Sequence, residues 1–158
     1  MDQHALDDAA AAALWNLRRA PLEHVGLLYE QDGAIYRTDT VLGGKDWARG
    51  RFAIPVGSLR GVFHNHPMSG NPRKDRARRE FSDDDKAVAK RLNRPSYIAA
   101  GNKLRRYDPA TGRTEDVLAE IPIDVIVRDL MVRLLNRDPN DPRGLYRESP
   151  NLPGLFAN

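Results

Sequence analysis

The sequence contains no cysteine and no long hydrophobic run, and both absences narrow what the chain can be. Without cysteine, disulfide scaffolds, thiol catalysis and thiolate metal sites are all excluded. No apolar stretch approaches the roughly 18–20 residues that a membrane span needs. The alanine-rich run at residues 9–15 follows two aspartates. A signal peptide has basic residues at that point, so we interpret the run as a helix and expect no membrane segment.

The sequence also lacks a large net charge, because 25 basic and 22 acidic residues leave a formal net charge of only +3. Residues 72–80 contain five basic and two acidic side chains, so this stretch alone accounts for the excess. It includes no aromatic residue, whereas a nucleic-acid binder usually interleaves aromatics with a broad basic face. Two interpretations stay open for it: a solvated loop, or a loop that engages an acidic partner.

Hydrophobic periodicity predicts an α+β (mixed α/β) fold in one domain at residues 1–136, followed by an extended, proline-rich tail at residues 137–158. Apolar alternation and turn signals predict strands at residues 22–29, 34–41, 59–63, 97–100, 103–107 and 114–118. Helical spacing predicts helices at residues 6–19, at residues 82–92 and from Pro122 onward. Residues 67–81 are so rich in proline, glycine and arginine that we expect irregular structure there.

The local feature that suggests chemistry is a hydrophobic strand ending in His64-Asn65-His66-Pro67. Residues two apart in a strand point to the same side, so both imidazoles would face one point. Imidazole is the commonest protein ligand for zinc, and a catalytic zinc has three protein ligands and an open position. A chance spacing, or two histidines that only cap the strand, is the simpler alternative.

A third ligand could come from the acidic run Asp83-Asp84-Asp85. Ser82 followed three residues later by an acid is also a typical start of a helix, with Ser82 as N-cap and Asp85 near the third helical position. The two interpretations are compatible, because a carboxylate fixed in the first turn of a helix can also face a metal ion.

A hydrolytic zinc site also needs a general base, usually a glutamate that does not bind the metal. Two glutamates flank the first predicted strand, and strand alternation places them on opposite faces. Glu23 begins that strand in Glu23-His24-Val25-Gly26, whereas Glu30 lies in the turn that follows, where a solvated acid is unremarkable.

Together these residues resemble the JAMM motif of JAB/MPN-type zinc metalloproteases, which matches three segments here: Glu23-x-x-Gly26, His64-x-His66-Pro67 and Ser82-x-x-Asp85. The resemblance extends over residues 6–135. The chain is most similar to bacterial JAB-like domains of the DUF4329 type, which often occur as toxin modules. The resemblance implies a curved β-sheet flanked by helices, the JAB/MPN (cytidine-deaminase-like) architecture, and hydrolysis of peptide or isopeptide bonds.

The resemblance also implies a role for each matched residue. His64, His66 and Asp85 would bind Zn²⁺, Glu23 would act as the general acid and base, and Ser82 would donate a hydrogen bond to the developing oxyanion. The segment between His66 and Ser82 is longer than in compact members of the family, and the extra residues are the basic stretch. We therefore expect the cations of this stretch to bind substrate, namely Arg73, Lys74 and Arg76.

The implied partners are a polypeptide substrate, either a protein or an isopeptide-linked conjugate, and an immunity protein if the chain is a toxin module. The implied location is the cytoplasm, or a target cell that receives the chain as an effector. Two alternatives belong to other classes. A catalytically silent JAB-like module would bind a protein partner, although it would not need to keep a base beside an open metal position. A nucleic-acid-binding domain using residues 73–79 would bind with a steep salt dependence.

Overall fold

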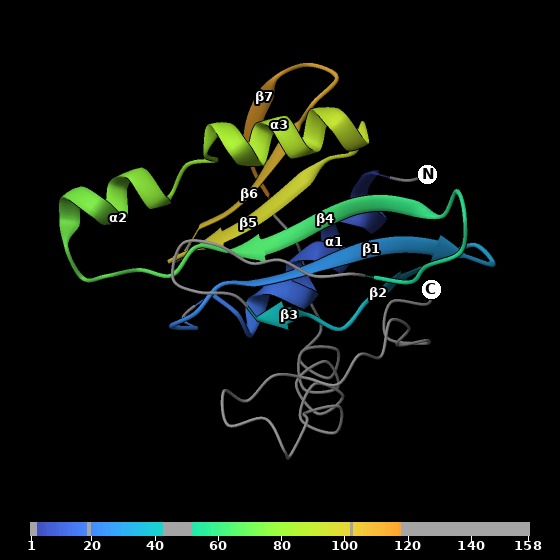
Figure 1. The fold of residues 1–158 in the computed structure, drawn as a ribbon, viewed down its shortest axis with the longest axis horizontal. Coiled ribbons are helices and arrows are strands. Elements are labelled where there is room, and N and C mark those ends of the chain that lie inside the picture. The colour runs from blue at the N-terminus through green and yellow to red at the C-terminus, as the bar shows by residue number, and fades with distance from the viewer. Residues whose placement is uncertain (1–2, 19, 43–51, 102, 118–158) are drawn as a thin grey trace, which may run out of the picture.

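The computed structural model describes residues 3–18, 20–42, 52–101 and 103–117. They form a mixed α/β structure with one open, seven-stranded sheet, in agreement with the predicted α+β class (Figure 1). Its strands are β1 (His24–Gln31), β2 (Ala34–Arg37), β3 (Val41–Leu42), β4 (Leu59–Asn65), β5 (Ser96–Ala100), β6 (Lys103–Asp108) and β7 (Arg113–Asp116). Its helices are α1 (Gln3–Trp15), α2 (Pro72–Arg78) and α3 (Asp83–Leu92).

The sheet has the order β2-β1-β4-β5-β6-β7, and β3 also pairs with β1. All neighbouring strands are antiparallel except β4 and β5, which are parallel and are connected through α2 and α3. The β1–β2 turn consists of Asp32 and Gly33, whose φ angles of 52° and 80° suit the tight turn that matches strand twist. The predicted strand at residues 34–41 is interrupted, because Thr38 accepts a hydrogen bond from the Leu27 amide through its side chain.

Helix α1 packs against one face of the sheet. Its alanines at positions 9–13 are all buried, and these small side chains let the helix lie close to β1, β2, β4 and β5. Leu14 of the helix and Phe63 of β4 are fully buried in this core. The helix begins earlier and ends earlier than predicted, at Gln3 and Trp15, so Arg18 lies after its last turn.

Helix α3 covers the opposite face at β5 and β6, where Phe81, Ala89, Ile98 and Tyr107 form a second, smaller core. The alternation along β5 shows that the two helices lie on different faces. Tyr97 and Ala99 belong to the α1 core and Ile98 to the α3 core. Side chains of β4 alternate in the same way, so His64 lies on the α3 face while Phe63 lies on the α1 face.

The expectation of irregular structure at residues 67–81 is wrong, because residues Pro72–Arg78 form α2. The Asn71 side chain caps this helix by accepting hydrogen bonds from the amides of Arg73 and Lys74, and Pro72 occupies the first turn. Figure 1 shows α2 at the left, beyond the end of β4.

The predicted helix from Pro122 and the tail at residues 137–158 lie outside the described residues. Within the part of the chain that the structure describes, no helix is both long and apolar enough to cross a membrane.

Candidate metal and hydrolytic site

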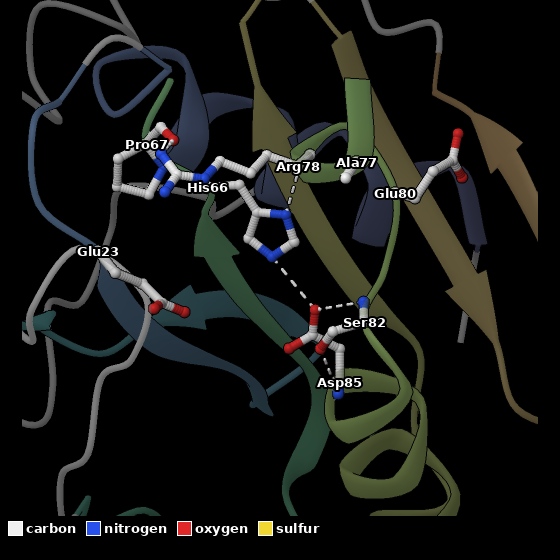
Figure 2. Close-up of a pocket in the computed structure, with 8 residues that line it drawn as sticks. All are labelled: Glu23, His66, Pro67, Ala77, Arg78, Glu80, Ser82 and Asp85. Carbon is white, nitrogen blue, oxygen red and sulfur yellow. Dashed lines mark hydrogen bonds and ion pairs between the residues drawn. The ribbon is translucent and has the colours of Figure 1, made fainter. Parts of the chain in front are cut away.

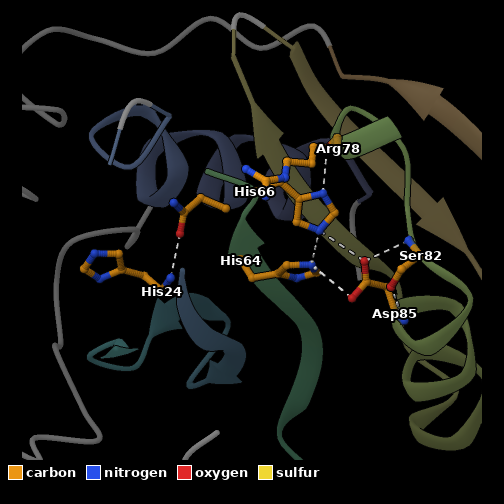
Figure 3. A network of polar contacts seen from close by, with 7 residues as sticks. His24, His64, His66, Arg78, Ser82 and Asp85 are labelled. Carbon is orange, nitrogen blue, oxygen red and sulfur yellow. Dashed lines mark hydrogen bonds and ion pairs between the residues drawn. The ribbon is translucent and has the colours of Figure 1, made fainter. Parts of the chain in front are cut away.

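Three side chains that are far apart in the sequence meet at the end of β4. His64 Nε2 lies 3.3 Å from Asp85 Oδ1, His66 Nε2 lies 3.2 Å from Asp85 Oδ2, and the two Nε2 atoms are 3.0 Å apart (Figure 3). His64 lies in β4 and His66 directly follows the end of that strand, with the two rings side by side, and Asp85 reaches them from the first turn of α3. The structure therefore brings together the three residues predicted as ligands.

The chemistry of these donors fits a zinc ion. Tetrahedral zinc with bonds of about 2.0–2.1 Å to nitrogen and oxygen separates its ligand atoms by roughly 3.3 Å. The two Nε2 atoms are 3.0 Å apart, and each lies 3.2–3.3 Å from a different oxygen of the Asp85 carboxylate. With one donor atom taken from each residue, the three atoms lie within 4.8 Å of one another, close enough to share one ion. Two imidazoles and one carboxylate also leave room for a fourth ligand, as in catalytic zinc sites. Among the described residues, His64, His66 and Asp85 form a group whose donor atoms lie close enough together to hold a metal ion.

The backbone fixes which nitrogen of His66 faces this group. His66 Nδ1 lies 2.7 Å from the carbonyl oxygen of Arg78, which can only accept a hydrogen bond, so Nδ1 carries a proton. In the neutral ring, Nε2 then presents its lone pair to Asp85 and His64. These lone pairs repel one another unless a proton on His64 Nε2 or His66 Nε2, or a metal ion, lies among them.

The electrostatics of the cluster agree with this interpretation. Burial alone would lower the pKa of His66, but the hydrogen bond and the charge of Asp85 outweigh it and raise that pKa. Burial alone would raise the pKa of Asp85, but the bonds with His64 and His66 hold it well below its usual range. Asp85 is therefore ionised at neutral pH and supplies the negative charge that attracts a cation.

Asp85 also completes the start of α3. Its Oδ2 accepts a hydrogen bond from the Ser82 amide at 3.0 Å, and its own amide donates to Ser82 Oγ at 3.1 Å. This reciprocal capping box confirms the predicted N-terminus at Ser82. These hydrogen bonds hold the Asp85 carboxylate in one orientation, so the same carboxylate caps α3 and faces the two histidines.

A cavity of about 220 Å³ opens beside the cluster, lined by Glu23, His66, Pro67, Ala77, Arg78, Glu80, Ser82 and Asp85 (Figure 2). Glu23 is buried and precedes β1, and its carboxylate points across the cavity towards His66 and Asp85. Glu30 lies near the other end of β1, where it pairs with Arg60 at 3.7 Å. Of the two glutamates considered from the sequence, only Glu23 lies at this cavity.

The residues predicted to bind substrate are not among those that line the cavity. Arg73, Lys74 and Arg76 lie on the exposed surface of α2, which contributes Ala77 and Arg78 to the cavity wall. His24 does not belong to the cluster either. Its ring lies 3.3 Å from Thr40 Oγ1, and Figure 3 shows it pointing away from the other two histidines.

Sequence reasoning missed two groups at this site. One is the Arg78 carbonyl that orients His66. The other is Asn65, whose side chain bonds the backbone on both sides of Glu23. An asparagine inside His-x-His was visible in the sequence, but its partners are backbone groups more than 40 residues earlier, which no local pattern indicates.

No protein-family model matches this chain, and no curated protein matches it in sequence.

Proposed function

We propose that this chain is a zinc-dependent hydrolase of the JAMM type that cleaves peptide or isopeptide bonds, with the JAB/MPN architecture. The observation that carries the proposal is the meeting of two histidines, one carboxylate and a separate glutamate beside one cavity, with one donor atom from each of the three ligands within 4.8 Å of the others. His64, His66 and Asp85 hold the ion, and Glu23 stands across the cavity from them. When bound, zinc lowers the pKa of a water molecule to about 7 and polarises the substrate carbonyl.

In this proposal the chain's own residues move the protons. Glu23 accepts a proton from the attacking water as the new carbon–oxygen bond forms, and then donates it to the leaving nitrogen as the carbon–nitrogen bond breaks. Ser82 Oγ accepts a bond from the Asp85 amide, so its hydroxyl proton is not used in the capping box. That hydroxyl donates to the carbonyl oxygen on which negative charge develops.

The test compares Glu23→Gln with a matched control, Glu30→Gln, which changes the same residue type near the other end of β1. Loss of a general base lowers the rate by about 10²–10⁴-fold, and zinc stays bound because Glu23 is not a ligand. The assay uses a fluorescein-labelled unfolded polypeptide and an isopeptide-linked conjugate, with zinc measured by mass spectrometry. Full activity in Glu23→Gln would rule out its role. A wild-type protein that binds zinc and hydrolyses neither probe would favour the silent binding module.

The charge distribution on α2 supports an acidic segment in the substrate. The two acids of this stretch are occupied elsewhere: Asp75 accepts bonds from the Ser69 and Gly70 amides, and Glu80 pairs with Arg105 at 2.5 Å. The cations are left exposed, namely Arg73, Lys74, Arg76 and Arg79. Since α2 contributes Ala77 and Arg78 to the cavity wall, its exposed cations lie beside the cavity, where an extended substrate would pass.

This substrate preference is tested by neutralising three cations of α2 and three exposed cations elsewhere. The test variant is Arg73→Gln/Lys74→Gln/Arg76→Gln, and the matched control is Lys90→Gln/Arg91→Gln/Arg113→Gln. Three exposed ion pairs at about 0.2–1 kcal/mol each correspond to a KM increase of roughly 3- to 150-fold for an acidic peptide. The control should leave KM unchanged. Equal effects of both variants would show that only the net charge matters.

A further inference from the structure

Strands β1 and β4 separate at the point where the cavity begins. They are paired from Tyr29 and Leu59 as far as Val25 and His64, and the pairing ends there. Strand β4 instead stays with β5, since Asn65 pairs with Ala99 and the His66 amide donates to the Ala99 carbonyl at 2.8 Å. Within the described residues, the segment that carries Glu23 therefore has no backbone ladder to β4.

The Asn65 side chain bridges this gap. Its Oδ1 accepts a hydrogen bond from the His24 amide at 2.6 Å, and its Nδ2 donates to the Leu22 carbonyl at 3.0 Å. Asn65 is only 1% exposed, so water cannot easily replace either bond. A carboxamide offers the same donor and acceptor as a peptide group, and this one holds the backbone immediately before and after Glu23.

We propose that Asn65 is a positioning residue for Glu23. The inference rests on the proposed function, because it concerns the base of that reaction. A general base must lie within hydrogen-bond reach of the proton that it takes, and a displacement of about 1 Å can cost about 10²-fold in rate. Asn65 stands between two proposed metal ligands in the sequence, yet its side chain holds the opposite wall of the cavity. One short segment of β4 thereby fixes both the ligands and the base.

A double-mutant cycle separates positioning from general stability. Asn65→Leu removes both hydrogen bonds at nearly constant volume, and we expect it to lower kcat by about 10²-fold with KM and bound zinc unchanged. In single-turnover assays, the same substitution should cause no further loss in a Glu23→Gln background, because the base is already gone. An equal loss in both backgrounds would overturn the inference. Thr38→Val, which removes a side-chain bond to the Leu27 amide of the same strand, is the matched control and should retain kcat.

Amide hydrogen exchange tests the bridge without any enzymatic activity. The His24 amide should exchange about 3- to 10-fold faster in Asn65→Leu, as expected when a hydrogen bond of ordinary net strength is lost. Unchanged His24 exchange would overturn the inference even if the wild-type protein hydrolyses peptides. If the wild type hydrolyses nothing while His24 exchange accelerates, the bridge stands and the proposed function fails. If Asn65→Leu does not fold, Asn65→Ser replaces it in both the kinetic and the hydrogen-exchange measurements.

Discussion

Replacing Gly26 by alanine tests how β1 and β4 are held in the register that faces Glu23 towards His66. Gly26 lies directly opposite Phe63 in the antiparallel ladder. A Cβ atom at position 26 would approach Phe63 Cε1 and Cε2 to 2.8 and 3.0 Å, and Cζ more closely still. The Phe63 ring is fully buried against α1, so it has no free space to move into.

The expected magnitude follows from two opposing effects. Overpacking a filled core costs about 1–3 kcal/mol, whereas exchanging glycine for alanine usually gains about 0.4–1 kcal/mol through the unfolded chain. The net loss for Gly26→Ala is therefore at most about 2.6 kcal/mol, which lowers Tm by up to about 10 °C in a protein of this size. Gly61→Ala is the matched control in the adjacent strand. Its new Cβ would be 3.3 Å from the Pro95 carbonyl oxygen, a tight contact but a looser one than at Gly26, so it should lose less stability than Gly26→Ala.

Urea unfolding of both variants checks this prediction, and Phe63→Leu provides the decisive comparison. Leucine lacks the outer ring atoms that the new Cβ would meet. Phe63→Leu alone should cost about 1–2 kcal/mol through a small cavity. Combined with Gly26→Ala, it should cost less than the two single changes together by at least about 0.5 kcal/mol. Strict additivity of the two substitutions would show that the new Cβ does not meet the Phe63 ring.

Two further predictions concern the capping box and the alkaline limit of stability. Ser82→Ala should lower the free energy of unfolding by about 1 kcal/mol, because the N-cap is lost, but it should still bind zinc. Asp85→Asn should weaken zinc binding at least 10-fold. Thermal unfolding measures the first effect, and calorimetric titration with zinc measures the second. Burial and the hydrogen bond to Asp7 raise the pKa of Tyr97 above its ordinary value of 10.0, so above about pH 10 the unfolded chain loses this proton first and stability falls with pH. Tyr97→Phe should reduce that slope by about 0.7 kcal/mol per pH unit at pH 10, and by up to about 1.4 kcal/mol per pH unit once the unfolded tyrosine is fully ionised. Urea titrations at pH 9–11 measure the slope, and an unchanged value would contradict the prediction.

The elements best predicted from the sequence are those with strong local signals. Ser82 caps helix α3 as predicted, because a serine cap followed by three acids stabilises a helix start regardless of tertiary context. The β5–β6 pair was predicted at residues 97–100 and 103–107, within one residue of the observed bounds. The convergence of the two histidines follows from alternation in an extended segment that continues one residue past the end of β4. The position of Asp85 follows from its place in the first turn of α3.

The parts that were missed depend on interactions that local patterns do not contain. Helix α2 has few apolar residues, so its composition suggested a loop, although Asn71-Pro72 is a recognisable cap and first turn. The interruption between β2 and β3 depends on the Thr38 side chain taking the place of a backbone partner. The groups that orient His66 and the Glu23 segment are a backbone carbonyl and a buried amide, whose partners the fold alone brings close.

The central claim is that His64, His66 and Asp85 hold one zinc ion beside Glu23. Anomalous X-ray scattering at the zinc edge, measured on crystals grown with one equivalent of zinc, tests it most directly. We predict a single strong peak within bonding distance of both Nε2 atoms and the Asp85 carboxylate, on the side open to the cavity. Crystals with zinc supplied but no peak at that position, and with the three side chains turned apart, would contradict the claim.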